Sequence, residues 1–265
     1  MRQLRVHPSL NLLLLTWIAL HVPSAWAQQT EPAASPSDFT ARASWPVPVG
    51  DNGTFGLLLF DNLEWQRTNG ADAFRWDVLG WRGGDFNRFW FKSEGLQNTS
   101  SSEGEMEVQG LYGKLVAPYF DLQAGVRVNQ RRDASSTTSR AYAVVALQGL
   151  SPYRFGIEPA LFVSNKGQIS ARFTASYDLL VSERLIFQPR LETNAAVTSD
   201  KGIGVGSGLN DAEIGFRVRY EVRREFAPYL GLTWKDSFGA TRRLAAGTGA
   251  GSAHFAVAAG VRVWF

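Results

Sequence analysis

Apolar and polar residues alternate along most of the chain, which is the pattern of β-strands that separate an apolar surrounding from water. In residues 120–129, Leu122 and Val126 share an apolar face, whereas Asp121 and Arg127 share the opposite face. The same arrangement recurs in three later segments, residues 168–179, 185–194 and 213–223. Segment after segment is charged on one face and largely apolar on the other, as a wall between lipid and a hydrated lumen requires.

Twelve such segments can be delimited after residue 54. They are approximately residues 55–66, 73–82, 87–95, 105–116, 119–130, 139–149, 153–164, 168–179, 185–195, 212–223, 227–236 and 253–265. Short turns such as Ala117-Pro118 alternate with longer links such as residues 196–211, although Asn165-Lys166-Gly167 is a tight turn where a long loop is expected. An even strand count with this alternation is typical of bacterial outer-membrane barrels. The sequence therefore predicts an all-β fold, a transmembrane antiparallel up-and-down β-barrel of 12 strands over residues 55–265.

The first 54 residues differ from the barrel segments. Residues 1–27 have the features of a secretory signal peptide, because Arg2 and Arg5 precede an apolar run and Ala25-Trp26-Ala27 provides a small-residue cleavage site. A membrane anchor is the alternative, but the apolar run is shorter than the about 20 residues that a spanning helix needs. Residues 28–54 are rich in proline, alanine and serine, and we expect them to form a flexible periplasmic segment.

Charge and composition narrow the functions that are open to such a barrel. The chain has 27 Lys plus Arg against 24 Asp plus Glu, and loss of Arg2 and Arg5 with the leader reduces 27 to 25. A nearly neutral protein offers no large basic surface to a phosphate backbone, so nucleic acid is not an expected partner. The chain has no Cys, which excludes thiolate metal sites, and His254 is the only His beyond the leader. Catalysis by a Ser–His or Asp–His pair would depend on that one residue, and we expect no enzyme activity.

Seven longer motifs lie in the predicted strands and turns. They are residues 61–66 (DNLEWQ), 83–95 (GGDFNRFWFKSEG), 117–127 (APYFDLQAGVR), 148–153 (QGLSPY), 188–192 (QPRLE), 208–213 (GLNDAE) and 223–229 (RREFAPY). In this order they resemble the CopB family, the outer-membrane copper resistance protein B (PcoB-like) of Gram-negative bacteria. The resemblance covers almost the whole chain after the leader.

This resemblance implies a barrel in the outer membrane of a Gram-negative bacterium that binds or passes copper ions, next to a periplasmic multicopper oxidase partner. The terminal aromatic residue, Phe265, resembles the signal that the barrel-assembly machinery reads. Family members commonly carry a Met- and His-rich segment after the leader, and often a His where this chain has Val128. Residues 28–54 contain neither Met nor His, and Met106 and His254 are the only ones beyond the leader. The soft ligands that suit copper are therefore mostly missing.

The inward face predicted for the strands carries charges of both signs. The expected neighbours are Arg75 with Asp77, Arg88 and Lys92 with Glu94, Arg154 with Glu158, Arg190 with Glu192, and Arg217 and Arg219 with Glu213 and Glu221. Charges of both signs favour a lumen wall that is stabilised by salt bridges. The ring of side chains that selects cations in a channel is mainly acidic. Alternatively, the carboxylates offer oxygen ligands that hold Cu(II) weakly and Cu(I) poorly. The candidate metal ligands are Met106, Asp121, Glu158, Glu192, Glu213, Glu221 and His254.

Two functions follow from these alternatives. The first is an outer-membrane barrel of copper resistance that binds or passes copper by coordination, without chemical turnover. The second is a general small-solute channel, or a purely structural barrel, that kept the family frame and lost the copper role. Alternation points His254 inward near an outer loop, whereas the facing of Met106 is not decided by the sequence.

Overall fold

The computed structural model describes residues 53–68, 71–151, 155–247 and 253–265. The predicted signal peptide and residues 28–52 of the expected periplasmic segment lie outside this part of the chain. The strands are β1 (Phe55–Thr68), β2 (Ala71–Gly83), β3 (Asn87–Asn98), β4 (Gly104–Ala117), β5 (Phe120–Arg132), β6 (Thr137–Ser151), β7 (Phe155–Ser164), β8 (Ile169–Tyr177), β9 (Leu179–Leu180), β10 (Leu185–Ala196), β11 (Gly208–Tyr220), β12 (Phe226–Ser237) and β13 (Ala253–Trp264). None of the helices in the described ranges is long and apolar enough to cross a membrane.

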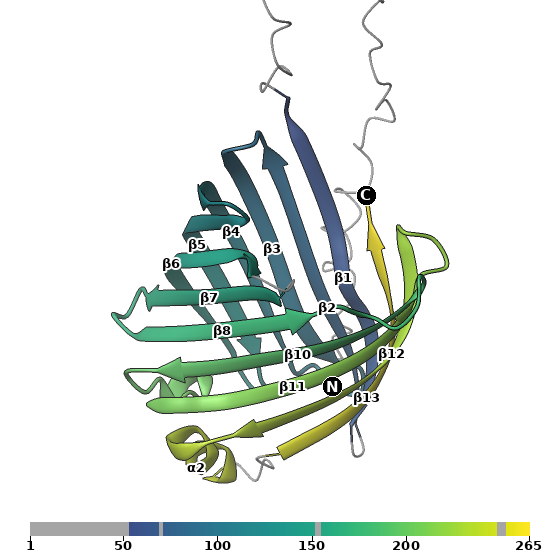
Figure 1. The fold of residues 1–265 in the computed structure, drawn as a ribbon. Helices are drawn as coiled ribbons and strands as arrows, with labels where there is room; N and C mark the ends of the chain where they lie inside the picture. Colours follow the sequence, from purple (N-terminus) through teal and green to yellow (C-terminus); the bar gives the residue numbers. More distant parts are fainter. Residues whose placement is uncertain (1–52, 69–70, 152–154, 248–252) are drawn as a thin grey trace, which may run out of the picture. The chain divides into compact units, whose positions relative to one another are not determined.

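The strands form one antiparallel sheet that closes on itself (Figure 1). The first strand, β1, pairs with β2 on one side and with the last strand, β13, on the other. Strands β8 and β9 both pair with β10 in a common register and are separated by Asp178, so they form one strand of the barrel. The closed sheet thus has twelve strands, and the predicted up-and-down barrel is confirmed.

The predicted faces of the strands are also confirmed. Val126 and Leu230 point outward and are 63% and 67% exposed, as expected for a surface that no other part of the described chain covers. The polar side chains of the alternate positions point inward, where Gln123 and Glu64 are fully buried. Arg217, which alternation places in the lumen, has a side chain that is only 5% exposed. The barrel therefore has an apolar outside and an inside that carries most of its buried polar side chains.

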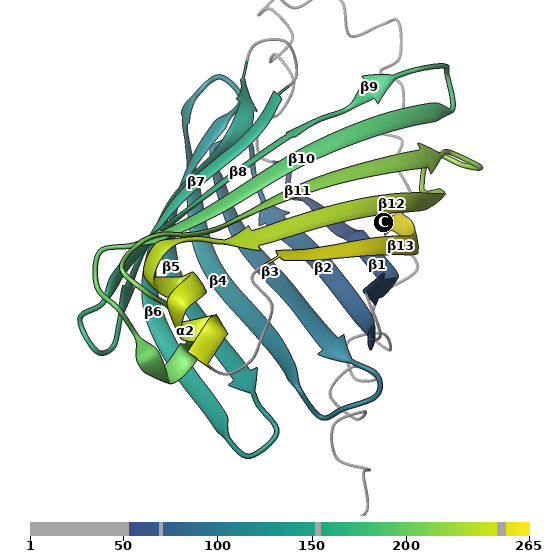
Figure 2. The ribbon, with the colours of Figure 1, turned by 90° about the horizontal axis from the view of Figure 1, so that it is seen from below.

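The two ends of the barrel differ. At the end that carries Phe265, the turns are short and comprise residues 84–86, 118–119, 181–184 and 221–225; we call it the terminal end. The opposite end, the loop end, carries residues 99–103, 133–136, 165–168, 197–207 and 238, together with helix α2 (Gly239–Gly247). Helix α2 packs beside the start of β11, where Gly206 N–H donates to Thr241 Oγ1 at 2.9 Å (Figure 2).

A few boundaries depart from the sequence prediction. Strand β11 begins at Gly208, so the link before it is shorter than expected, and it ends before Glu221. Part of the link after Ser237 is helical, because residues 241–246 combine good helix formers such as arginine, leucine and alanine. The tight turn predicted at Asn165-Lys166-Gly167 is present, and Gly167 adopts a φ of 77°, which only glycine adopts freely.

A β-bulge in β1 changes which residues reach the lumen. The register of β1 with β2 shifts between Phe60 and Asn62, so the regular alternation is broken at Asp61. As a result two consecutive polar side chains point inward. Asp61 accepts a hydrogen bond from Arg262 at 2.8 Å, and Asn62 accepts one from Tyr229 at 3.2 Å.

Candidate functional site in the barrel lumen

Charged side chains joined by ion pairs fill much of the lumen. We call the following set the central ion-pair network: the carboxylates of Glu64, Asp77, Glu94, Glu107, Glu192 and Glu213, and the guanidinium groups of Arg75, Arg127, Arg172, Arg190 and Arg217. All of these side chains are less than one third exposed. Buried charges need partners of opposite sign, and every member has one.

Several of these ion pairs bridge the lumen between strands that are far apart in the sheet. Arg190 on β10 lies 3.6 Å from Asp77 on β2, and at least four strands separate β10 from β2 in either direction. Arg172 on β8 contacts Glu107 on β4 at 3.0 Å and Glu94 on β3 at 3.6 Å. The network therefore crosses the lumen rather than only lining its wall.

This geometry corrects the partners expected from the sequence. Among the predicted pairs whose residues the structure describes, only that of Arg190 with Glu192, at 3.1 Å, is present. Arg75 instead pairs with Glu213 at 2.5 Å, and Lys92 with Glu158 at 2.6 Å. Positions i and i+2 of a strand are about 6.6 Å apart, whereas extended side chains from opposite walls meet in a narrow barrel. Arg154 lies outside the described residues.

One side of the lumen is apolar, which the sequence analysis missed. Inward-facing apolar side chains of β2, β3, β4, β6 and β7 form a cluster that we call the aromatic sector: Leu79, Trp81, Trp90, Leu111, Tyr142, Val144, Ala146, Ala160 and Phe162. The guanidinium group of Arg127 lies over the Phe162 ring at 4.4 Å and joins this sector to the central ion-pair network. The sequence feature that indicates this sector is a large apolar residue at an inward position of a strand. Trp90, which lies between the inward-facing Arg88 and Lys92, is an example.

Two of the candidate ligands line one cavity near the terminal end. This cavity of about 340 Å³, the terminal pocket, is lined on its lumen side by Trp90, Asp121, Gln148, Glu158, Thr174 and Ser176. Asp121 Oδ2 accepts a hydrogen bond from Arg88 Nη1 at 2.9 Å, and Glu158 Oε1 accepts one from Lys92 Nζ at 2.6 Å. The structure thus brings Asp121 and Glu158 to the same pocket.

The remaining candidate ligands are distributed over the barrel. Glu192 and Glu213 face each other on neighbouring strands within the central ion-pair network. Glu221 lies in a turn at the terminal end, and His254 shares the inward face of β13 at the loop end. Met106 points outward and is 40% exposed. Within the described ranges, no group of three or more His, Cys, Asp or Glu side chains could hold a metal ion.

An ion pair also fastens a loop at the loop end. Asp200 in residues 197–207 accepts hydrogen bonds from Arg140 Nε at 2.9 Å and from the backbone N–H of Gly202 at 2.9 Å. Arg131 Nη1 donates to the carbonyl of Ile203 at 3.0 Å, so two strands hold the same loop. The Arg140 guanidinium, by hydrogen bonding to the carboxylate, holds the pKa of Asp200 below its usual range.

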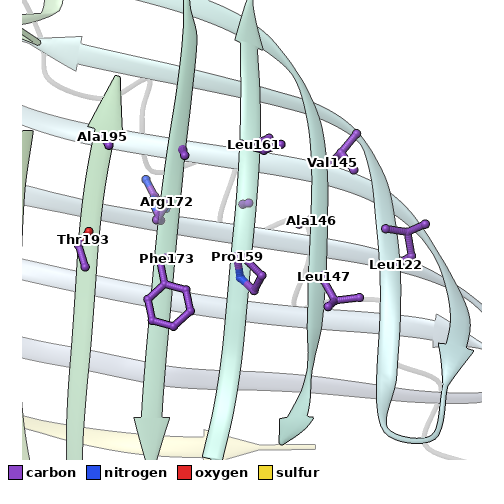
Figure 3. A pocket seen from close by; sticks show the side chains of 12 residues that line it. Leu122, Val145, Ala146, Leu147, Pro159, Leu161, Arg172, Phe173, Thr193 and Ala195 are labelled. Atoms are coloured by element: carbon purple, nitrogen blue, oxygen red, sulfur yellow. The ribbon is translucent and has the colours of Figure 1, made fainter. Parts of the chain in front are cut away.

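The outward surface has an apolar groove of about 440 Å³. Figure 3 shows Leu122, Val145, Leu161 and Phe173, which line it from neighbouring strands. These side chains are 40% to 58% exposed, and Ala195 lines the same groove from β10. The groove continues the apolar outer face of the barrel.

Comparison with known proteins identifies the family. The family described as "Copper resistance protein B precursor (CopB)" matches residues 54–265, which is the whole described barrel. The chain belongs to this family. "Copper resistance protein B" of Escherichia coli is 42% identical over 217 residues, which are 82% of this chain and 72% of that protein. "Copper resistance protein B homolog" of Pseudomonas syringae pv. tomato (strain ATCC BAA-871 / DC3000) is 35% identical over 252 residues, 88% of this chain and 84% of that one.

Solved structures support the fold. The NanC porin aligns with a TM-score of 0.51 at 12% sequence identity and covers 78% of this chain and 98% of that one. At such low identity the likeness concerns the barrel alone. With the membership in the copper resistance protein B family, it locates the chain in the Gram-negative outer membrane, where the apolar outer face contacts lipid. The word "precursor" in the family description agrees with the predicted signal peptide.

Proposed function

We propose that this barrel acts in copper resistance by passing copper ions through its lumen, with carboxylate oxygens as transient ligands and without chemical turnover. The observation that carries the proposal is the match of the copper resistance protein B family across residues 54–265. Within the lumen, the oxygen donors of Asp121, Glu158, Glu192 and Glu213 suit Cu(II) as a cargo better than Cu(I).

The donor set fits copper in transit and does not fit a resident copper ion. Met106 faces outward, and His254 stands alone at the loop end, where it could contact an incoming ion first. The carboxylates deeper in the lumen are already paired, as Glu213 is with Arg75. A copper ion would therefore compete with guanidinium groups for oxygens, so binding is expected to be weak and reversible. Met106 is left out of the proposed pathway.

The ion pairs that bridge the lumen favour a second candidate function, which is a purely structural one. A barrel closed by pairs such as Arg190 with Asp77 could serve as a structural element that has lost the copper role. In either case we propose that the barrel-assembly machinery reads the last strand, and in the first case that a periplasmic multicopper oxidase acts beside the barrel.

Growth of a deletion strain on graded copper separates the two candidates. Complementation with the unaltered gene should restore copper tolerance, and complementation with Glu192→Gln/Glu213→Gln should restore it incompletely, because the two facing carboxylates are lost. The matched control, Glu183→Gln/Glu225→Gln, removes two exposed carboxylates from turns at the terminal end and should behave as the unaltered protein. A deletion strain without a copper-dependent defect would favour the structural barrel.

Copper titration of the refolded full chain tests the lumen ligands directly. The unaltered protein should bind more Cu(II) than the Glu192→Gln/Glu213→Gln protein, with equal folding of both shown by far-UV circular dichroism and by heat-dependent gel mobility. Equal copper binding by the two proteins would contradict the role of these carboxylates.

A further inference from the structure

Three buried polar atoms near the terminal pocket have no hydrogen-bond partner within the described part of the chain. They are Trp90 Nε1, Asp121 Oδ1 and Gln123 Oε1. These side chains are 6%, 6% and 0% exposed. Buried polar groups in folded proteins nearly always have partners, so a cluster of unpaired ones points to a bound species. Trp90 and Asp121 themselves line the cavity of about 340 Å³.

The walls of the pocket are rich in acceptor oxygens. Arg88 occupies only Oδ2 of Asp121, which leaves Oδ1 free, and Gln123 uses its Nε2 to donate to Gln148. The hydroxyl-bearing Thr174 and the carboxylate of Glu158 line the same space. A species that fits these oxygens must donate hydrogen bonds, carry positive charge, or do both.

The size of the cavity and the number of ligands identify the class of ion. A water molecule takes about 30 Å³ in the liquid, so the pocket has room for an ion with its water shell. Mg²⁺-like cations give up water reluctantly and are commonly bound through one or two carboxylates while they keep several waters. The two carboxylates here, Asp121 and Glu158, match that number, whereas a dehydrated metal ion would need more protein ligands.

We propose that the terminal pocket binds a hydrated divalent cation of the Mg²⁺ and Mn²⁺ class, held through its water shell by Asp121 and Glu158. Trp90 Nε1 donates to an oxygen of that shell. Because Arg88 and Lys92 balance the two carboxylates, binding is weak, with a dissociation constant on the order of 10⁻⁴ to 10⁻³ M, as at other low-affinity sites for hard cations. The site shares Asp121 and Glu158 with the proposed copper path, but its binding of Mg²⁺ or Mn²⁺ does not depend on the passage of copper.

Binding of Mn²⁺ alone to the refolded full chain, followed by electron paramagnetic resonance, tests the site. The double variant Arg88→Gln/Asp121→Asn removes the carboxylate without leaving an unpaired arginine, and it should weaken Mn²⁺ binding at least tenfold. The matched control is Asp61→Asn/Arg262→Gln, which makes the same change in charge at another lumen ion pair near the terminal end. The control should bind Mn²⁺ as the unaltered protein does.

Two further single variants distinguish a loss of Mn²⁺ binding from a folding defect of the double variant. Glu158→Gln changes one atom, and Trp90→Phe keeps the ring while it removes the N–H; each should weaken Mn²⁺ binding several-fold in a protein that shows native heat-dependent gel mobility. Equal Mn²⁺ affinity in the unaltered protein and all pocket variants, or the absence of saturable binding, would overturn the site. Since no copper is present, this result is separate from the outcome of the copper growth assay.

Discussion

The lumen of this barrel contains two regions that are stabilised by different chemistry. In the aromatic sector, Leu111 and Phe162 are 0% and 2% exposed and are packed mainly by other apolar side chains. In the central ion-pair network, a charge such as Arg172 depends on partners from distant strands. Loss of an apolar side chain leaves a cavity, whereas loss of a charge leaves its partners buried and unpaired. The two regions should therefore respond differently to substitution.

The largest effect is expected from Arg172→Gln. This residue lies within 4 Å of Glu94, Glu107 and Glu192, so its loss leaves several buried carboxylates with fewer partners. We expect a loss of about 3 to 5 kcal/mol in the free energy of unfolding, as measured for other broken buried ion pairs. Denaturant unfolding of the barrel in lipid vesicles measures this difference.

The matched control for this prediction is Arg67→Gln, because the Arg67 side chain is 82% exposed and lies 3.6 Å from Asp72. We expect no measurable change in the free energy of unfolding for this surface pair. If Arg172→Gln were no more destabilising than Arg67→Gln, the network would not be a structural requirement of the barrel.

Leu111→Ala should have a smaller but clear effect on the aromatic sector. The substitution removes a fully buried side chain from β4 and leaves a cavity, and we expect a loss of about 3 kcal/mol in the free energy of unfolding. Leu230→Ala is the control, since Leu230 is 67% exposed on the outer face and lipid can fill the space. Equal losses for the two variants would show that the aromatic sector does not pack as a core.

The local facing of residues was predictable from the sequence, but the contacts between distant strands were not. Alternation alone assigned Val126 to the outside and Arg127 to the lumen, because a one-residue shift would reverse both. It failed at Asp61 and Asn62, where a bulge sends two neighbours inward. Alternation also does not distinguish an apolar side chain that packs in the lumen, as Trp90 does, from one at the membrane interface.

The partners in the candidate site show the same limit. Arg75 and Glu213 are 138 positions apart in the chain, and only closure of the barrel brings them together. The sequence identified most of the charged side chains of the lumen but not their pairing, which depends on the tilt of the strands and the width of the barrel. Asp121 on β5 and Glu158 on β7 reach the same cavity because only β6 lies between their strands.

The smallest effect concerns the ion pair that fastens residues 197–207 to Arg140 on β6. Asp200→Ala should release residues 197–207 from Arg140 and speed hydrogen exchange at the Gly202 amide, which donates to Asp200 Oδ1. The global free energy of unfolding should change little, because loops at the low-stability end of a protein open without unfolding the rest. Asp72→Ala is the control, since Asp72 pairs with the exposed Arg67 at 3.6 Å elsewhere at the loop end.

The pH dependence of this contact follows from the lowered pKa of Asp200. The unfolded chain takes up the proton at about pH 3.9, so the stabilisation is complete above that pH and is lost as the pH falls through the lower pKa of the folded protein. The carboxyl ¹³C signal of Asp200 should therefore titrate below pH 3.9, and Gly202 exchange, after correction for its intrinsic pH dependence, should rise only there. A titration midpoint at or above pH 3.9 would mean that Arg140 does not hold the loop through the Asp200 carboxylate.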